Sequence, residues 1–134
     1  ALDRDLPFTI RQTMFLGTID AFYAGCATRK AASYFNARKN LDEWRKALAA
    51  GTPILAGLTV DGSFEALGRR GTLDRVRGTG EEGGHAVSVV GYRRDGRFII
   101  RNSWGKDWGD GGFAYASPAY IRARFFDESY VLTL

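Results

Sequence analysis

The sequence predicts an α+β domain built on an antiparallel sheet, with one main helix at about residues 41–50. Three observations support this fold class. A capped helical pattern precedes an apolar strand at residues 53–60, and the last third of the chain alternates apolar runs with turn residues. The chain has 134 residues, 45% hydrophobic and 25% charged, which is enough to bury one core. We therefore expect residues 1–134 to form a single domain.

The main helix has clear signals at both ends. Asn40 is predicted to cap its N-terminus, and Glu43 stands three positions later, as in a capping box. Gly51 ends the helix and Pro53 prevents its continuation. One face of the helix carries apolar residues at helical spacing, namely Leu41, Trp44 and Leu48.

Extended segments lie on either side of this helix. Residues 33–38 are predicted to form a short strand, and residues 53–60 are too apolar to be half exposed, so we expect a central strand there. Gly68–Gly84 contains six glycines and many charges, which predicts a long mobile loop. After a strand at residues 114–116, Ser117 and Pro118 break the pattern. A turn or short helix follows, and residues 129–134 close the sheet.

Two apolar runs joined by a polar link predict a β-hairpin near the C-terminal end of the chain. His85, the only histidine, opens the first strand, and Asn102 closes the second. A two-residue turn at Asp95 and Gly96 would leave these two residues about 13 Å apart along the strand. A four-residue loop at residues 93–96 makes them diagonal neighbours at roughly 7 Å. We favour the longer loop, which pairs Tyr92 with Arg97 and Val87 with Asn102.

The motifs on this hairpin resemble the histidine and asparagine signatures of papain-like (C1-type) cysteine peptidases. They are His85-Ala86-Val87 leading to Val90-Gly91-Tyr92, then Asn102-Ser103-Trp104-Gly105, and then Trp108-Gly109-Asp110-Gly111-Gly112-Phe113. The order of elements from about Tyr34 to Leu134 resembles the C-terminal, right-hand, barrel-like half of that fold. Leu6-Pro7-Phe8 is similar to an N-terminal motif of bacterial members.

The resemblance implies roles for four residues. His85 would be the general base and acid of a cysteine peptidase, and Asn102 would fix its ring through a side-chain oxygen. Trp104 would lie over the hydrogen bond between them and keep water away. Trp108 would pack structurally in support of this pair, with an indole edge near the leaving-group side of a cleft.

The resemblance also places three small residues at the pocket for the substrate's second residue before the cut. These are Ala56, Gly57 and Ala86, and their size implies space for a bulky apolar side chain.

The position of the single cysteine does not fit the nucleophile motif of this family. Cys26 lies only 59 residues before His85, and no glutamine stands a few residues ahead of it. Two readings stay open for this residue. Cys26 is either a small buried hydrophobe, or it faces His85 in a compact arrangement at the start of a helix running to Ala32.

Three functional hypotheses follow. In the first, this chain supplies the histidine and asparagine of a peptidase that cleaves peptides or proteins, and the nucleophilic cysteine lies on another segment or chain. Under this hypothesis the present chain would be inactive alone and would expose an apolar face where the cysteine-bearing part docks. The second is a self-contained thiol hydrolase or transferase using Cys26, His85 and Asn102. The third is a non-catalytic binding module or inhibitor.

Composition argues against several other classes. The net charge is +4, but its basic clusters lack interleaved aromatic residues, so we expect a solvated face and no nucleic-acid partner. One histidine and one cysteine cannot make a zinc site, and we expect no metal or other cofactor. No apolar run is long enough for a membrane span. Because the sequence begins with Ala1, we expect a processed or trimmed chain.

Overall fold

The computed structural model describes residue 27, residues 30–78 and residues 80–133 of the chain. Contacts group Tyr34–Thr133 into one compact unit, which is the part described below. The single-domain prediction for residues 1–134 stays a prediction. Cys26 and the motif at residues 6–8 lie outside the described residues. Within the described part, no helix is both long and apolar enough to cross a membrane.

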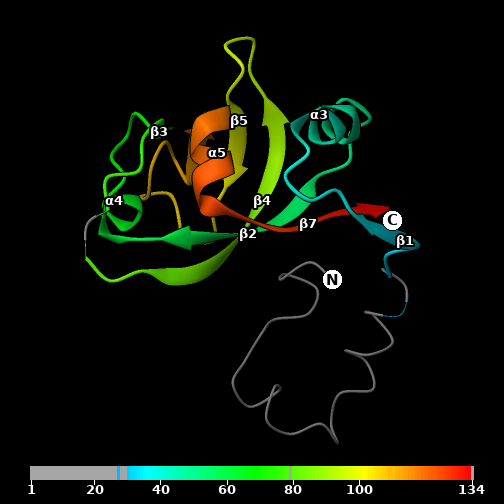
Figure 1. Ribbon diagram of the computed structural model, residues 1–134, viewed down its shortest axis with the longest axis horizontal. Helices are drawn as coiled ribbons and strands as arrows, with labels where there is room; N and C mark the ends of the chain where they lie inside the picture. The colour runs from blue at the N-terminus through cyan, green and yellow to red at the C-terminus, as the bar shows by residue number, and fades with distance from the viewer. Residues whose placement is uncertain (1–26, 28–29, 79, 134) are drawn as a thin grey trace, which may run out of the picture. The chain divides into compact units, whose positions relative to one another are not determined.

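Seven strands form one sheet in the order β1-β7-β2-β4-β5-β6-β3 (Figure 1). Antiparallel pairs join β2 to β4 and β7, and β5 to β4 and β6, whereas β3 runs parallel to β6. The predicted α+β fold with an antiparallel sheet is therefore confirmed. The strands are β1 (Ser33–Asn36), β2 (Ile54–Val60), β3 (Thr72–Leu73), β4 (Gly83–Tyr92), β5 (Phe98–Arg101), β6 (Phe113–Ala116) and β7 (Phe125–Thr133).

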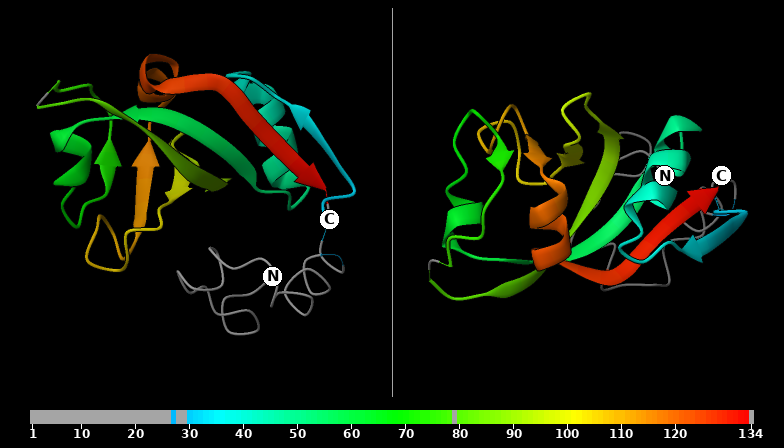
Figure 2. Two further views of the ribbon diagram at one scale, coloured as in Figure 1. Left: turned by 90° about the horizontal axis from the view of Figure 1, so that it is seen from below. Right: turned by 45° about the horizontal axis from the view of Figure 1, so that its top comes forward.

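Within residues 30–78 and 80–133, three helices lie around this sheet, and Figure 2 shows them from two further directions. They are α3 (Leu41–Ala49), α4 (Gly62–Glu65) and α5 (Pro118–Arg124). The helix predicted at about 41–50 is α3, and the Asn40 side chain caps it by accepting from the backbone N–H groups of Asp42 and Glu43. The expected capping box is not closed. The Asn40 N–H donates to the Ala37 carbonyl, and the Glu43 carboxylate binds Lys46.

The indole of Trp44 ties α3 to the sheet. Its ring meets Phe98 of β5 and Phe125 of β7 edge to face, at centroid distances of 5.5 and 5.7 Å. Its N–H donates to the Arg38 carbonyl at 2.7 Å. Trp44 is fully buried, so its apolar surface is removed from water, and its one polar group is hydrogen-bonded inside the core.

Strand β2 lies centrally between β7 and β4, as predicted, but only one of its faces is buried. Ile54, Ala56, Leu58 and Val60 point into the core, whereas Leu55 is 43% exposed. The expectation that this segment is too apolar to be half exposed was wrong. Successive side chains of a strand point to opposite faces, so an apolar sequence does not by itself bury both.

The glycine-rich segment before β4 is more ordered than the predicted long loop. Thr72 and Leu73 pair with β6, and the Leu73 side chain is buried. The Arg97 guanidinium binds both carboxylate oxygens of Asp74, at 2.9 and 2.7 Å. This hydrogen-bonded pair lowers the pKa of Asp74. A second correction concerns the last strand, since β7 begins at Phe125 and not at residue 129.

In the hairpin of β4 and β5, Asn102 lies next to Val87 as predicted, but the loop length and the register near the loop differ from the prediction. Its loop is one residue shorter than expected, with the Arg93 N–H donating to the Arg97 carbonyl and Gly96 at φ 86°. Tyr92 therefore pairs with Phe98, and the expected pairing with Arg97 was wrong. A bulge between Val89 and Gly91 then shifts the register by one. Beyond the bulge, Ser88 pairs with Arg101, and Asn102 follows next to Val87.

Candidate active site

The structure brings His85 and Asn102 together across the β4–β5 hairpin. His85 lies on β4 opposite Leu58, and Asn102 directly follows β5. The His85 Nε2 atom is 2.8 Å from the Asn102 Oδ1 atom. Asn102 is 8% exposed and His85 is half-buried, so the amide end of this hydrogen bond is shielded from water.

The neighbouring backbone fixes the orientation of the Asn102 amide. The Ser103 N–H lies 2.8 Å from the same Oδ1 atom and can only donate. The atom that receives both contacts must therefore be the carbonyl oxygen. Since an amide oxygen can only accept, His85 Nε2 must carry a proton. The Nδ1 atom of the neutral ring then has the free lone pair, and it bonds to no residue in the part of the chain that the structure describes.

Aromatic side chains surround the imidazole. The Trp104 ring lies 4.5 Å from the His85 ring at an interplanar angle of 32°. Phe64 of α4 approaches His85 edge to face at 6.1 Å and also contacts Trp104 and Trp108. Trp108 is buried, and its N–H donates to the Phe64 carbonyl at 2.8 Å. Trp104 is 40% exposed and covers one face of the imidazole.

A buried ion pair holds α4 in place beneath these rings. One oxygen of Asp61 caps α4 by accepting from the backbone N–H groups of Ser63 and Phe64. The other oxygen accepts from the Arg124 guanidinium of α5 at 2.7 Å, and Arg124 also binds Glu82. Asp61 and Arg124 are 3% and 7% exposed. The network therefore links α5 to the helix that places Phe64 against His85.

Asp61 is held in its charged form. Burial is the largest single influence on its carboxyl and acts to raise the pKa. Hydrogen bonds from Ser63 and Phe64, together with the charge of Arg124, act in the opposite direction. They outweigh burial, so the pKa of Asp61 lies below its ordinary value.

The second polar atom of the Asn102 amide is unpaired. Its Nδ2 atom is buried and has no hydrogen-bond partner among the described residues. A shallow pocket of about 430 Å³ opens beside it on the outer face of the sheet. The lining includes Leu55, Ala86 and Ser88. Buried donors in native proteins almost always have a hydrogen-bond partner, either protein or ordered water.

The three small residues predicted to form a substrate pocket do not share one face. Ala56 is 1% exposed and points into the core, so its assignment to a pocket wall was wrong. Gly57 and Ala86 pair across β2 and β4 on the opposite face. Phe126 of β7 covers Gly57 so closely that a Cβ atom there would lie 2.8 Å from its ring. The space over these residues is smaller than the sequence suggested.

Sequence reasoning missed several residues of this site. Ser103 was visible only as part of a motif, with no role assigned to it, and Phe64 was not singled out. Asp61 stands before Gly62-Ser63, a helix N-cap signal that could have been found. No sequence signal points to Phe126, because its position depends on the register of β7 against β2.

The described residues offer no metal site. No group of three or more histidine, cysteine, aspartate or glutamate side chains gathers within the part of the chain that the structure describes. The described residues provide one imidazole whose ring is oriented by an amide. Cys-His-Asn arrangements contain the same pairing of side chains.

Comparison with known proteins identifies the family. The family model described as "Papain family cysteine protease" matches residues 6–122. This match covers most of the 134 residues, and both predicted signature motifs lie within it. The chain belongs to the papain family of cysteine proteases.

Individual relatives agree with this family. "Cathepsin B-like CP2" of Giardia intestinalis is 31% identical over 144 residues, covering 94% of this chain and 47% of the relative. "Cathepsin B-like CP3" of the same organism is 44% identical over 75 residues, covering 51% of this chain and 23% of the relative.

A solved structure shows the same fold. It is the crystal structure of xylellain, a cysteine protease from Xylella fastidiosa, with a TM-score of 0.69 and 28% identity. The similarity covers 85% of this chain and 44% of xylellain. The chain thus spans about half or less of the length of the proteins that it matches.

Proposed function

We propose that this chain supplies the general base and its orienting group to a papain-type cysteine peptidase, and that the nucleophilic cysteine comes from another segment or chain. The observation that carries this proposal is the 2.8 Å contact between His85 Nε2 and Asn102 Oδ1. Together with the Ser103 N–H, it leaves Nδ1 as the basic nitrogen. Family membership supports the reaction class.

In this mechanism His85 acts first as a general base and then as a general acid. Its Nδ1 atom takes the proton of a cysteine thiol, and the thiolate attacks the carbonyl carbon of a peptide bond. The Nδ1–H then protonates the leaving amine as the C–N bond breaks. A water molecule, deprotonated by the same nitrogen, cleaves the thioester and restores the thiol. Asn102 keeps the ring aligned throughout, and Trp104 limits water access to their hydrogen bond.

One feature supports a cysteine-bearing segment packing against the outer face of β2 and β4. Leu55, which lines the pocket there, is 43% exposed although it lies on a central strand. A docked segment would cover Leu55.

The proposed substrate pocket is formed by Gly57 and Ala86, with Phe126 as its limit. Because the Phe126 ring lies over Gly57, the pocket should accept a small or medium apolar side chain and not the bulkiest ones. This replaces the wide pocket expected from the small residues alone.

The experiment is a peptidase assay of this chain with and without the cysteine-bearing segment. We expect no thiol-dependent cleavage by the chain alone. In the active assembly, His85→Ala should lower kcat by at least about 100-fold, the usual scale for a general base. Arg122→Ala, an exposed change on α5, is the matched control and should leave kcat unchanged. Cleavage by the chain alone that disappears with Cys26→Ala would overturn the proposal.

A further inference from the structure

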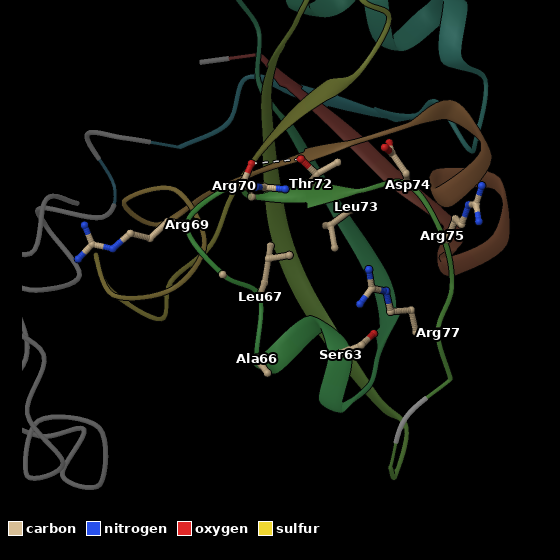
Figure 3. A pocket seen from close by; sticks show the side chains of 12 residues that line it. Ser63, Ala66, Leu67, Arg69, Arg70, Thr72, Leu73, Asp74, Arg75 and Arg77 are labelled. Atoms are coloured by element: carbon tan, nitrogen blue, oxygen red, sulfur yellow. Dashed lines mark hydrogen bonds between the residues drawn. The ribbon is translucent and has the colours of Figure 1, made fainter.

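A groove lined by basic residues lies beside α4 and β3. It has a volume of about 680 Å³, within the range of sites that hold small ligands and short peptide segments. Residues of α4, β3 and the segments that flank β3 form its walls (Figure 3). The apolar part of the surface comes from Ala66, Leu67 and Leu73.

Four arginines line this groove, and none of them forms an ion pair with a described residue. They are Arg69, Arg70, Arg75 and Arg77. In Figure 3 the Arg77 side chain reaches into the hollow between Ser63 and Leu73. The one acidic residue of the lining, Asp74, is already bound by both donors of the Arg97 guanidinium. Because Arg97, which is not part of the lining, binds Asp74, the four arginines give the groove a net positive charge.

Ion pairing among the other arginines of the described chain is mixed. Arg45, Arg97 and Arg124 each bind a carboxylate, whereas Arg94 and Arg122 form no ion pair with a described residue. The groove is distinguished by the number of arginines in its lining, because like charges brought together raise the local potential and favour an anionic ligand. Guanidinium groups bind carboxylates with two parallel hydrogen bonds.

The lining favours a peptide over a nucleic acid. It includes no aromatic residue on which a base could stack, and base stacking is a main contribution to single-strand binding. The apolar floor of Leu67 and Leu73 instead suits aliphatic side chains between acidic ones. A small inorganic anion would leave that floor uncovered.

We propose that this groove binds an acidic segment of a polypeptide, through contacts that do not involve His85 or Asn102. Carboxylates of the segment pair with Arg70 and Arg77 on opposite walls, and its aliphatic side chains lie on Leu67 and Leu73. The groove and His85 share one element, because α4 contributes Ser63 to the groove lining and Phe64 to the contact with His85.

The test is binding of a fluorescein-labelled octapeptide of alternating glutamate and leucine to the 134-residue chain, followed by fluorescence anisotropy. We expect saturable binding that weakens as salt is added, since the pairs are exposed. The same peptide with glutamine in place of glutamate should bind at least about tenfold more weakly. Arg70→Glu/Arg77→Glu should also lose at least about tenfold in affinity, whereas His85→Ala should bind as the wild type does.

The matched control is Arg94→Glu/Arg122→Glu, which makes the same change in net charge at exposed positions outside the groove. It should change the affinity by less than about threefold. An equal loss in both double variants would overturn the proposal, because only overall charge would then matter. Circular dichroism checks the fold of each variant, and Arg70→Gln/Arg77→Gln replaces the reversal if that variant is unfolded.

Competition distinguishes other ligands of the same charge. An eight-nucleotide single-stranded DNA that displaces the peptide at lower concentration than unlabelled peptide would overturn the proposal in favour of nucleic acid. Displacement by inorganic phosphate at the same concentration as peptide would reduce the groove to a simple anion site. Absence of saturable peptide binding would also overturn it.

Discussion

The ion pair between Asp61 and Arg124 should be a main determinant of the stability of this domain. Replacing Asp61 with alanine removes the α4 cap and leaves a buried guanidinium with Glu82 as its remaining carboxylate partner. Loss of one partner of a buried pair costs about 3–5 kcal/mol, and loss of a cap costs ~1 kcal/mol. The lost cap adds to the loss and the retained contact between Arg124 and Glu82 reduces it, so we expect Asp61→Ala to lower the free energy of unfolding by about 3–5 kcal/mol.

Urea unfolding followed by tryptophan fluorescence measures this change. Asp61→Asn is the matched variant, since asparagine also caps helices but carries no charge. It should lower the free energy of unfolding by less than Asp61→Ala does. The double variant Asp61→Ala/Arg124→Met should be more stable than the sum of the single losses predicts, because it leaves no unpaired charge. A loss below about 1 kcal/mol for Asp61→Ala would refute this reasoning.

The same pair predicts a pH dependence with a definite sign. The pKa of Asp61 is lowered in the folded state, so its contribution to stability is fully present above the unfolded value of about 3.9. That contribution is lost as the pH falls through the lower, folded-state pKa. The stability difference between the wild type and Asp61→Asn should therefore be constant near neutral pH and shrink under strongly acidic conditions.

Two further predictions concern glycines and their neighbours. Gly109→Ala should lower the free energy of unfolding by more than about 2 kcal/mol in urea titrations, because its φ is 58° and a methyl group would overlap the Phe113 carbonyl oxygen. Gly111→Ala, at φ 61° but in open space, should lose only about 1–2 kcal/mol, and equal losses would contradict the steric argument. Phe126→Ala should uncover Gly57 and shift the peptidase toward bulkier apolar residues at the second position before the cut, measured as kcat/KM on a substrate series. An unchanged preference would exclude Phe126 as the limit of that pocket.

The sequence was most informative where one residue type does one local job. Asn40 and Gly51 mark the two ends of α3, and the structure confirms both within about one residue. Local chemistry also accounts for the break at Ser117, whose side chain caps α5. Such signals need no knowledge of distant partners, because the interaction lies within a few residues of the signal.

Predictions failed where the answer depends on contacts between distant segments. The hairpin loop is one residue shorter than predicted, and the bulge near Val90 shifts the register back by one residue. The sequence therefore suggested the pairing at Asn102 but neither the loop length nor the bulge. Leu73 is buried because β6 lies beside it, and Ala56 faces the core because the register of β2 is set by β4 and β7. The sequence near those residues contains none of this information.

The protonation state of the one histidine tests the central claim most directly. Because His85 is the only histidine in the chain, the nitrogen resonances of its imidazole can be assigned without ambiguity. Long-range ¹H–¹⁵N NMR of the neutral ring should show the proton on Nε2, with a shift that changes in Asn102→Ala. A proton on Nδ1, or an Nε2 signal that is the same in Asn102→Ala, would contradict the proposed pair.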